Sequence, residues 1–215
     1  LIVSNLNGPL GDVRVRQALI MAIDRDGLLK AAEQGYGSTT DAITSKAVWS
    51  AADAATLQAA FGDLETHPYD LDAAKKLIEE AGVAGEEIVI ATAPISSAFD
   101  VIAQATAAAA TAIGLNPRIE TVTPNKFTTL FSDPSAREGI DLFYTLWYES
   151  TADPLEMLAI LRTDQFSNYG NWSDTAFDQA IEAAVAAPVS DPTRTATLAD
   201  AQRWLHYVYD PTSTE

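Results

Sequence analysis

Apolar residues recur along most of this chain at the spacing of an α-helix. Asp12 stands before residues 13–23, whose apolar side chains fall on one face, so the pattern predicts a helix capped by Asp12. Asp70 caps a second clear helix, which Gly82 ends in the left-handed conformation. Further helices are expected over residues 28–34, 51–61, 97–113, 125–131, 155–161 and 173–187, and from Pro192 onward. The last two are expected to bury faces formed by Phe177, Ile181, Ala184 and Val185, and by Leu198, Ala201, Leu205 and Val208.

Four stretches are β-prone. Residues 1–6 and 87–91 are rich in branched apolar side chains, and residues 117–122 alternate like a strand. Residues 142–148 are almost wholly apolar and aromatic, which is typical of a strand buried on both faces. Because strands alternate with helices, the order predicts an α/β fold with a partly parallel sheet. The chain carries no internal repeat, low-complexity segment or linker, so one domain over residues 1–215 is expected.

The last of these strands changes character where it ends. Tyr144, Trp147 and Tyr148 precede residues 149–154, a polar stretch that cannot continue a central strand. Ligands of open α/β sheets bind at the carboxyl ends of the strands, so the rings suit the wall of a binding site. They equally suit the end of an ordinary core strand, with two of the three rings in the core. The residues alone leave both interpretations open.

Acidic residues outnumber basic ones 30 to 13, which gives a formal net charge of −17. Nucleic acids and anionic membrane faces require a basic patch, so neither is expected as a partner. High acidity keeps a protein soluble, and a monomer is expected. The absence of cysteine excludes disulfides and thiolate metal sites. The longest apolar runs fall far below the roughly 18 residues that span a bilayer.

No catalytic or metal-binding constellation is recognisable in the sequence. His67 and His206 lie far apart, and each suits a surface or helix-flank position. In "DRDG", Gly27 comes fourth, whereas a calcium loop has its glycine sixth, so a helix break fits better. The sequence also holds no phosphate-binding glycine loop and no nucleophile elbow. We therefore expect no catalytic residue, no metal site and no cofactor.

Five segments form an ordered set. They are "DVRVRQALIMAIDRDGLL" (12–29), "YDLDAAKKLIEEAG" (69–82), "WYESTADP" (147–154), "NYGNWSDTAFDQAI" (168–181) and "DPTRTATLADAQRWL" (191–205). In order and spacing they resemble the family 5 extracellular solute-binding proteins of ABC importers, the dipeptide-, oligopeptide- and nickel-binding group. The third segment stands where that family has Trp-x-x-Asp-Tyr-x-Asp-Pro. The resemblance covers nearly the whole chain.

The resemblance implies an α/β, periplasmic-binding-protein-like (type II) lobe with a mixed sheet flanked by helices. It implies that residues 1–215 form a single domain, the second ligand-binding lobe of a longer two-lobe protein, with residues 1–8 and about 206–215 near the hinge. Such a protein captures a peptide or another small solute at the periplasmic or extracellular face of the cytoplasmic membrane, in some cases as a lipoprotein. It delivers that solute to ABC permease subunits, and no bond is made or broken.

The resemblance also places the end of residues 142–148 on the wall of the ligand cleft. The oligopeptide binders hold the peptide amino terminus with an Asp three residues after the Trp, and here Ser150 takes that position. A hydroxyl cannot neutralise an ammonium ion, and Glu149 substitutes only where the loop bends. Asp153 suits the capping of the helix that follows, and Trp49 and Trp172 are weaker candidates. The candidate ligand-binding residues are Tyr144, Trp147, Tyr148, Glu149, Ser150 and Asp153. The three aromatic rings among them suit stacking on a sugar, a planar group or a peptide side chain.

Two other functions remain as alternatives. One is an acidic α/β hydrolase-like enzyme that uses carboxylates, and the other is a sensory or interaction module on the same fold. Turnover of esters, peptides or glycosides that depends on one Asp or Glu would favour the enzyme. Stabilisation by an added solute would favour a binding protein.

Overall fold

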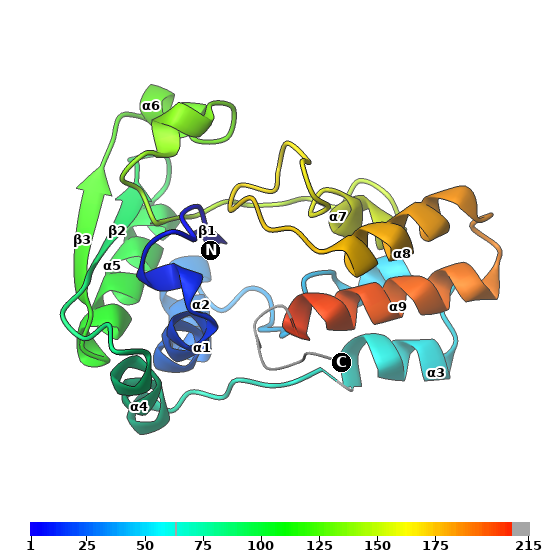
Figure 1. Cartoon of the computed structure of the whole chain (residues 1–215), viewed down its shortest axis with the longest axis horizontal. Coiled ribbons are helices and arrows are strands. Elements are labelled where there is room, and N and C mark those ends of the chain that lie inside the picture. Colours follow the sequence, from blue (N-terminus) through cyan, green and yellow to red (C-terminus); the bar gives the residue numbers. More distant parts are fainter. Residues whose placement is uncertain (63, 208–215) are drawn as a thin grey trace. The chain divides into compact units, whose positions relative to one another are not determined.

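The computed structural model describes residues 1–62 and 64–207, the last two by their backbone alone (Figure 1). Contacts between residues divide the chain into two compact units. Unit 1 comprises Leu1–Thr39 and His67–Leu146, and unit 2 comprises Thr40–Thr66 and the chain from Trp147 onward. Each unit has its own hydrophobic core. The hydrophobic pattern does not indicate this division, and that both units act together as one ligand-binding lobe stays a prediction.

Unit 1 contains a four-stranded mixed sheet in the order β1-β4-β2-β3. The central strand β2 runs parallel to both β3 and β4, with Ile90 opposite Ile119 on one side and Leu142 on the other. The edge strand β1 is antiparallel to β4. The four strands are Ile2–Val3 (β1), Glu87–Thr92 (β2), Asn116–Thr121 (β3) and Leu142–Phe143 (β4). A mixed sheet flanked by helices was predicted from the sequence, and the structure confirms it.

Burial separates the centre of this sheet from its edge. Every residue of β2 after Glu87 is buried, whereas β3 is mostly exposed and contains Pro117, which an edge strand tolerates. Parallel strands need a crossover connection, and the 16-residue helix α5 supplies it between β2 and β3. In Figure 1, α5 lies beside these two strands, and α1 and α2 pack on α5. The helix α5 therefore lies directly against β2 and β3, and α1 and α2 reach the sheet region through α5.

The helix ends of unit 1 follow the local signals in the sequence. The carboxylate of Asp12 accepts from the backbone N–H of Arg14 at 2.9 Å, and Asp70 caps α4 in the same way. Gly82 ends α4 with a φ of 72°. The helix α2 begins at Arg25 rather than at the predicted residue 28, because the side chain of Asp24 caps it. The helices are Val13–Ala22 (α1), Arg25–Glu33 (α2), Leu71–Ala81 (α4), Ser97–Ala112 (α5) and Pro124–Thr129 (α6), with 3₁₀ turns at Pro9–Gly11 and Pro134–Arg137.

A buried carboxylate fixes the start of β4. Asp141 is 7% exposed, and its two oxygens accept from the backbone N–H of Val89 at 2.7 Å and from the amide of Asn5 at 2.8 Å. These bonds join the first segment of the chain to β2 and β4. They satisfy both oxygens of an ion that burial would otherwise penalise.

The strand predicted over residues 142–148 is wrong in its length. β4 ends at Phe143, and its pairing with β1 and β2 covers only two residues. Beyond it, Leu146 is 50%, Trp147 43% and Tyr148 79% exposed. The apolar composition of residues 144–148 has two causes other than strand pairing. Tyr144 packs on the ring of Phe99, and at Leu146 the chain leaves unit 1 for unit 2.

Unit 2 is helical in its described part. Residues of α8 and α9 form most of its core, as predicted for Phe177, Ile181, Ala184, Leu198 and Ala201. Two members of the predicted faces differ, because Val185 is exposed and Leu205 is only half-buried. Val208 and the predicted hinge-proximal end after residue 207 lie outside the described residues. The helices are Ala54–Leu57 (α3), Leu155–Ala159 (α7), Thr175–Ala186 (α8) and Pro192–Tyr207 (α9), with a 3₁₀ turn at Lys46–Trp49 and a π-helical turn at Gln58–Gly62.

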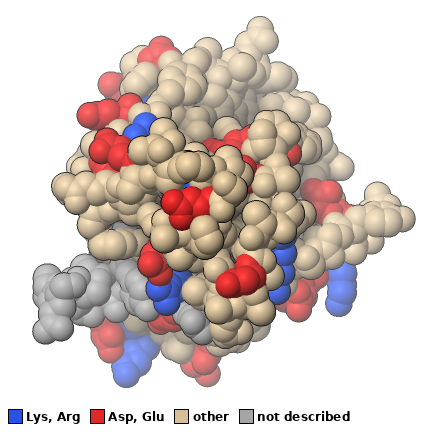
Figure 2. Space-filling model, turned by 90° about the vertical axis from the view of Figure 1, so that its right-hand side faces the viewer, with Lys and Arg blue, Asp and Glu red and all other residues tan. Residues whose placement is uncertain are grey.

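On the one face shown in Figure 2, the acidic side chains occur in several places rather than in one patch, with Lys and Arg among them. Surface charges separated by more than about 10 Å are largely screened at ordinary salt concentrations. Within the described residues, none of the helices combines the length and apolarity needed to cross a membrane.

Candidate functional site

The predicted site residues after Tyr148 lie in a short loop of unit 2, residues 149–154, which we call the exit loop. Glu149 bends back within this unit. Its Oε1 accepts from the backbone N–H of Ser45 at 3.1 Å and its Oε2 from the Ser45 hydroxyl at 2.6 Å. Both carboxylate oxygens of Glu149 therefore already have a partner.

Glu156, in the first turn of α7, holds the middle of the exit loop. Its carboxylate accepts from the backbone N–H and the hydroxyl of Ser150, at 2.9 Å each, and from those of Thr151, at 2.8 Å each. These donors lower the pKa of Glu156 to about 2, with the backbone N–H of Ser150 the largest cause. Glu156 is thus ionised at neutral pH, and the Ser150 hydroxyl donates to it.

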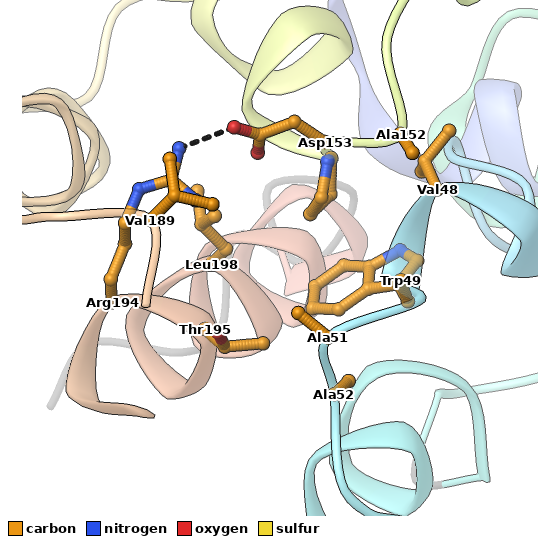
Figure 3. Close-up of a pocket in the computed structure, with 11 residues that line it drawn as sticks. Val48, Trp49, Ala51, Ala52, Ala152, Asp153, Val189, Arg194, Thr195 and Leu198 are labelled. Carbon is orange, nitrogen blue, oxygen red and sulfur yellow. Dashed lines mark hydrogen bonds and ion pairs between the residues drawn. The ribbon is translucent and has the colours of Figure 1, made fainter. Parts of the chain in front are cut away.

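Asp153 anchors the end of the exit loop in two directions. One oxygen accepts from the backbone N–H of Leu155 at 3.0 Å, so Asp153 contacts the start of this helix, although the N-cap residue is Pro154 rather than the predicted Asp153. The other forms an ion pair at 2.6 Å with Arg194 of α9 (Figure 3). Arg194 is only 5% exposed, and its Nε also donates to the carbonyl of Ala184 at 2.9 Å. The guanidinium therefore ties the exit loop to both α8 and α9.

The cavity beside this ion pair is small. Trp49, Val48 and Leu198 contribute to its wall, as Figure 3 shows, and its volume is about 20 Å³. A space of this size holds about one water molecule. We therefore interpret it as a packing gap in unit 2 and not as a solute site.

The three rings of the predicted site differ in their surroundings. Tyr144, in unit 1, is half-buried, with its ring centroid 4.9 Å from that of Phe99 in an edge-to-face contact. Trp147 and Tyr148, in unit 2, are exposed. The alternative that two of the three rings belong to the core therefore does not describe the structure. Trp147 and Tyr148 therefore expose apolar ring surface to water. They directly precede the exit loop, which is held by the contacts of Glu149, Glu156 and Asp153 described above.

The two weaker candidates are structural. Trp49 is 2% exposed, and its indole N–H donates to the hydroxyl of Thr44 at 2.8 Å. Trp172 packs on the buried ring of Phe177 with the centroids 5.0 Å apart. The 3₁₀ turn Lys46–Trp49 carries Trp49 into the core of unit 2.

Sequence reasoning missed Glu156 and Arg194. Glu156 stands three residues after Asp153, but its carboxylate accepts from Ser150 and Thr151 and not from the backbone N–H of Asp153, so the capping-box spacing does not account for its role. Arg194 lies in the first turn of α9, where the helix dipole disfavours a cation, and this position implies an acidic partner. The identity of that partner, 41 residues away, has no local signal.

The histidines and carboxylates of the described residues do not form a candidate metal site. His67 is half-buried, and the side chain of His206 lies outside the description. Within the described ranges, no three His, Cys, Asp or Glu side chains are grouped so that they could hold a metal ion.

Comparisons with known proteins extend this description. Residues 1–169 match the sequence model of the bacterial extracellular solute-binding proteins, family 5, middle part. The chain is 28% identical over 188 residues to the dipeptide-binding protein of Escherichia coli (strain K12), which covers 83% of this chain and 32% of that protein. It is 26% identical over 194 residues to the glutathione-binding protein GsiB of Salmonella paratyphi A, covering 86% of this chain and 35% of that protein. The chain thus spans about a third of the length of these curated relatives, which are named as binding proteins rather than as enzymes.

A solved structure shows the same fold. The periplasmic binding protein DppA of Helicobacter pylori, in complex with the peptide STSA, superposes with a TM-score of 0.78 at 22% identity, over 95% of this chain and 38% of that chain. This likeness confirms the predicted periplasmic-binding-protein-like fold.

Proposed function

Since this chain belongs to the family 5 bacterial extracellular solute-binding proteins, we propose that it is the second ligand-binding lobe of the substrate-binding component of an ABC transporter. The protein captures a peptide or another small solute outside the cytoplasmic membrane and presents it, as a monomer, to the permease subunits. The observation that carries this proposal is the family match over residues 1–169, together with relatives that are named for the solutes they bind.

The proposed mechanism is closure of two lobes around the solute. Hinge closure buries the ligand and creates the shape that a permease can recognise. This chain supplies only one of the two lobes, so by itself it should bind the solute weakly. The free energy of binding comes from contacts that both lobes make at once.

The residues that contact the solute in this proposal are Tyr144, Trp147, Tyr148, Glu149, Ser150 and Asp153. Trp147 and Tyr148 supply exposed ring surface for stacking. The contacts from Ser45 and Glu156 keep the exit loop in one conformation, so that little conformational entropy is lost on binding. Besides the contact proposed for it, Asp153 positions the exit loop through its ion pair with Arg194.

The charge pattern narrows the class of solute. By the resemblance, the oligopeptide binders use a carboxylate at the position of Ser150, and here the Ser150 hydroxyl donates to Glu156. Glu149 is the carboxylate next to Ser150 in the sequence, and Ser45 donates to both of its oxygens. We therefore expect that a free peptide amino terminus contributes little to binding, and that stacking on the rings contributes more.

A thermal-shift screen of the full-length protein tests the function. The panel contains dipeptides with free and N-acetylated amino termini, monosaccharides and disaccharides, and nickel–histidine complexes. A true ligand at 100 times its Kd stabilises the folded protein by about 2.7 kcal/mol. We expect at least one member of the panel to do so, with N-acetylation of a peptide changing its Kd less than threefold. A protein that no solute class stabilises, or one that turns over a panel member, contradicts the proposed function.

A matched pair of variants separates charge from position at Glu149. Glu149→Gln keeps an acceptor for Ser45 but removes the negative charge, and Glu182→Gln removes a charge from the exposed face of α8. If the rings of Trp147 and Tyr148 hold the solute, neither variant changes the Kd of the solute by more than about twofold. A tenfold loss in Glu149→Gln alone shows instead that this carboxylate pairs an ammonium group of the solute.

A further inference from the structure

A series of hydrogen bonds within unit 2 leads from the interior of α9 to the exit loop. Gln202 of α9 is 1% exposed. Its Oε1 accepts from the hydroxyl of Thr44 and, at 3.3 Å, from the backbone N–H of Thr44. Its Nε2 donates to the carbonyl of Ala60 at 2.5 Å. Because Thr44 and Ala60 are buried as well, these groups depend on the Gln202 amide for a partner.

The partners of Gln202 fix the orientation of its amide. A backbone N–H only donates and a carbonyl only accepts, so the amide oxygen faces Thr44 and the amide nitrogen faces Ala60. The Thr44 hydroxyl donates to Gln202 and accepts from the indole N–H of Trp49 at 2.8 Å. Thr44 is therefore held from two sides, by α9 and by the 3₁₀ turn that contains Trp49.

Ser45, the residue after Thr44, is the one that holds Glu149. Its backbone N–H and its hydroxyl donate to the two carboxylate oxygens of Glu149, at 3.1 and 2.6 Å. Ser45 is exposed, so water competes for both donors. An anchored Thr44 keeps the backbone of Ser45 in place, which reduces the conformational entropy lost when the two bonds form.

The helix α9 therefore reaches both ends of the exit loop. At the last part of the loop, Arg194 of α9 pairs with Asp153 at 2.6 Å (Figure 3). At the first residue of the loop, the series of bonds that begins at Gln202 ends on Glu149. Both holding residues belong to one continuous helix, which gives the two ends of the loop a common rigid support.

We propose that Gln202 is a positioning residue, which holds the start of the exit loop through Thr44 and Ser45. Trp147 and Tyr148 directly precede this loop, so the same bonds determine where their rings lie. That the rings contact a solute rests on the proposed function, whereas the hold on the loop does not.

Hydrogen exchange in the full-length protein, measured by mass spectrometry, tests the hold on the loop. Gln202→Met removes the amide at similar side-chain size, and the backbone amides of Ser150 and Thr151 should exchange about tenfold faster, while those of α8 change less than about threefold. The control Ile181→Ala weakens the core at α8, makes none of these hydrogen bonds, and should speed exchange in α8 more than in the loop. If Gln202→Met speeds exchange in α8 as much as in the loop, its role is general packing and the proposal is overturned.

A second background shows whether the effect passes through Glu149. Glu149→Ala removes the acceptor of both Ser45 donors, so it should itself speed the exchange of Ser150 and Thr151. Adding Gln202→Met to Glu149→Ala should then change this exchange less than about twofold, because the series of bonds is already broken. An equal tenfold change in both backgrounds means that Gln202 acts by another route, which contradicts its assigned role.

A milder pair of variants decides the question if Gln202→Met does not fold. Thr44→Val keeps the side-chain shape but removes the hydroxyl, and Thr44→Ser keeps the hydroxyl at the loss of one methyl group. Only Thr44→Val should speed exchange in the exit loop, by about three- to tenfold, since it breaks a bond to Gln202. Equal exchange in the two variants contradicts the proposal.

The proposal and the proposed function fail separately. The probe is the panel member that raises the melting temperature of the full-length protein most, and Gln202→Met should raise its Kd more than twofold. If that Kd stays within twofold while exchange in the exit loop rises, Gln202 does not position the solute contacts and the proposal fails, but the transport function stands. If no panel member raises the melting temperature, the transport function fails, and the exchange rates alone decide the role of Gln202.

Discussion

Replacing Arg194 with Met should destabilise unit 2 by about 3 kcal/mol. The guanidinium is 5% exposed and bonds Asp153 at 2.6 Å and the carbonyl of Ala184 at 2.9 Å. A hydrogen bond to a charged group contributes about 1.5–3 kcal/mol, and a carbonyl left without its donor costs about 1 kcal/mol. Asp153 is 23% exposed, so water partly replaces the lost cation and the loss stays below the roughly 3–5 kcal/mol of a fully buried pair.

Tryptophan fluorescence during urea unfolding measures this loss selectively. All four tryptophans of the sequence, Trp49, Trp147, Trp172 and Trp204, lie in unit 2. The unfolding midpoint should fall while the slope stays constant, since the surface exposed on unfolding is nearly the same.

Two further variants isolate the ion pair. Arg203 of α9 pairs with Asp200 at the surface, so Arg203→Met should cost less than about 0.5 kcal/mol. A double-mutant cycle of Arg194→Met with Asp153→Asn should give a coupling of about 1.5–3 kcal/mol. If Arg194→Met is no more destabilising than Arg203→Met, or if the coupling is near zero, the exit loop is not held by this pair and the reasoning fails.

Three further predictions concern stability. Glu156→Gln removes a carboxylate whose pKa is lowered from 4.5 to about 2 in the folded protein. Because a lowered pKa adds stability above the pKa of the unfolded chain, the wild-type chain should resist urea better than the variant at pH 7. This advantage should disappear as the pH falls from 4.5 to 2. Gly82→Ala, at a φ of 72° with open space around the added Cβ, should cost about 1 kcal/mol by circular dichroism, and Gly82→Asn less. Asp141→Asn replaces one acceptor oxygen by an NH₂ group, which then faces the N–H of Val89 or the amide of Asn5. Hydrogen exchange at the Val89 amide should report a loss of stability of about 1–3 kcal/mol. The control Asp133→Asn, at an exposed cap, should leave this exchange unchanged.

Local signals in the sequence predicted most helix ends correctly. Asp12, Asp70 and Gly82 act within a few residues of their own position, so their effect depends little on the rest of the fold. The central strand β2 was also predicted well, since continuous burial gives a continuous apolar run.

The strand that ends at Phe143 was harder to predict. A buried strand and a segment that passes from one unit into another can have the same apolar and aromatic composition. Composition indicates how apolar the surroundings are, but it does not indicate which backbone groups form hydrogen bonds. Tyr144 packs against Phe99, and Tyr148 stays in water, yet both belong to one apolar run.

Some features of the candidate site could likewise be predicted from the sequence, and others could not. The family motif located the exit loop, and the position of Asp153 before the next helix predicted its contact with the start of that helix, although the N-cap residue is Pro154. The partners that hold the loop, Ser45 and Arg194, lie 104 residues before Glu149 and 41 residues after Asp153. Contacts at such separations depend on tertiary packing, and a single sequence carries no signal for them.

Calorimetric titration of the full-length protein with the solute found in the thermal screen tests the central claim most directly. Trp147→Ala should raise the Kd at least tenfold, which is a loss of about 1.4 kcal/mol, because the solute loses a stacked ring. Phe166→Ala removes another exposed ring of unit 2, outside the proposed site, and should leave the Kd within twofold. A Trp147→Ala variant that binds the solute as tightly as the wild-type protein would show that this segment does not contact the ligand.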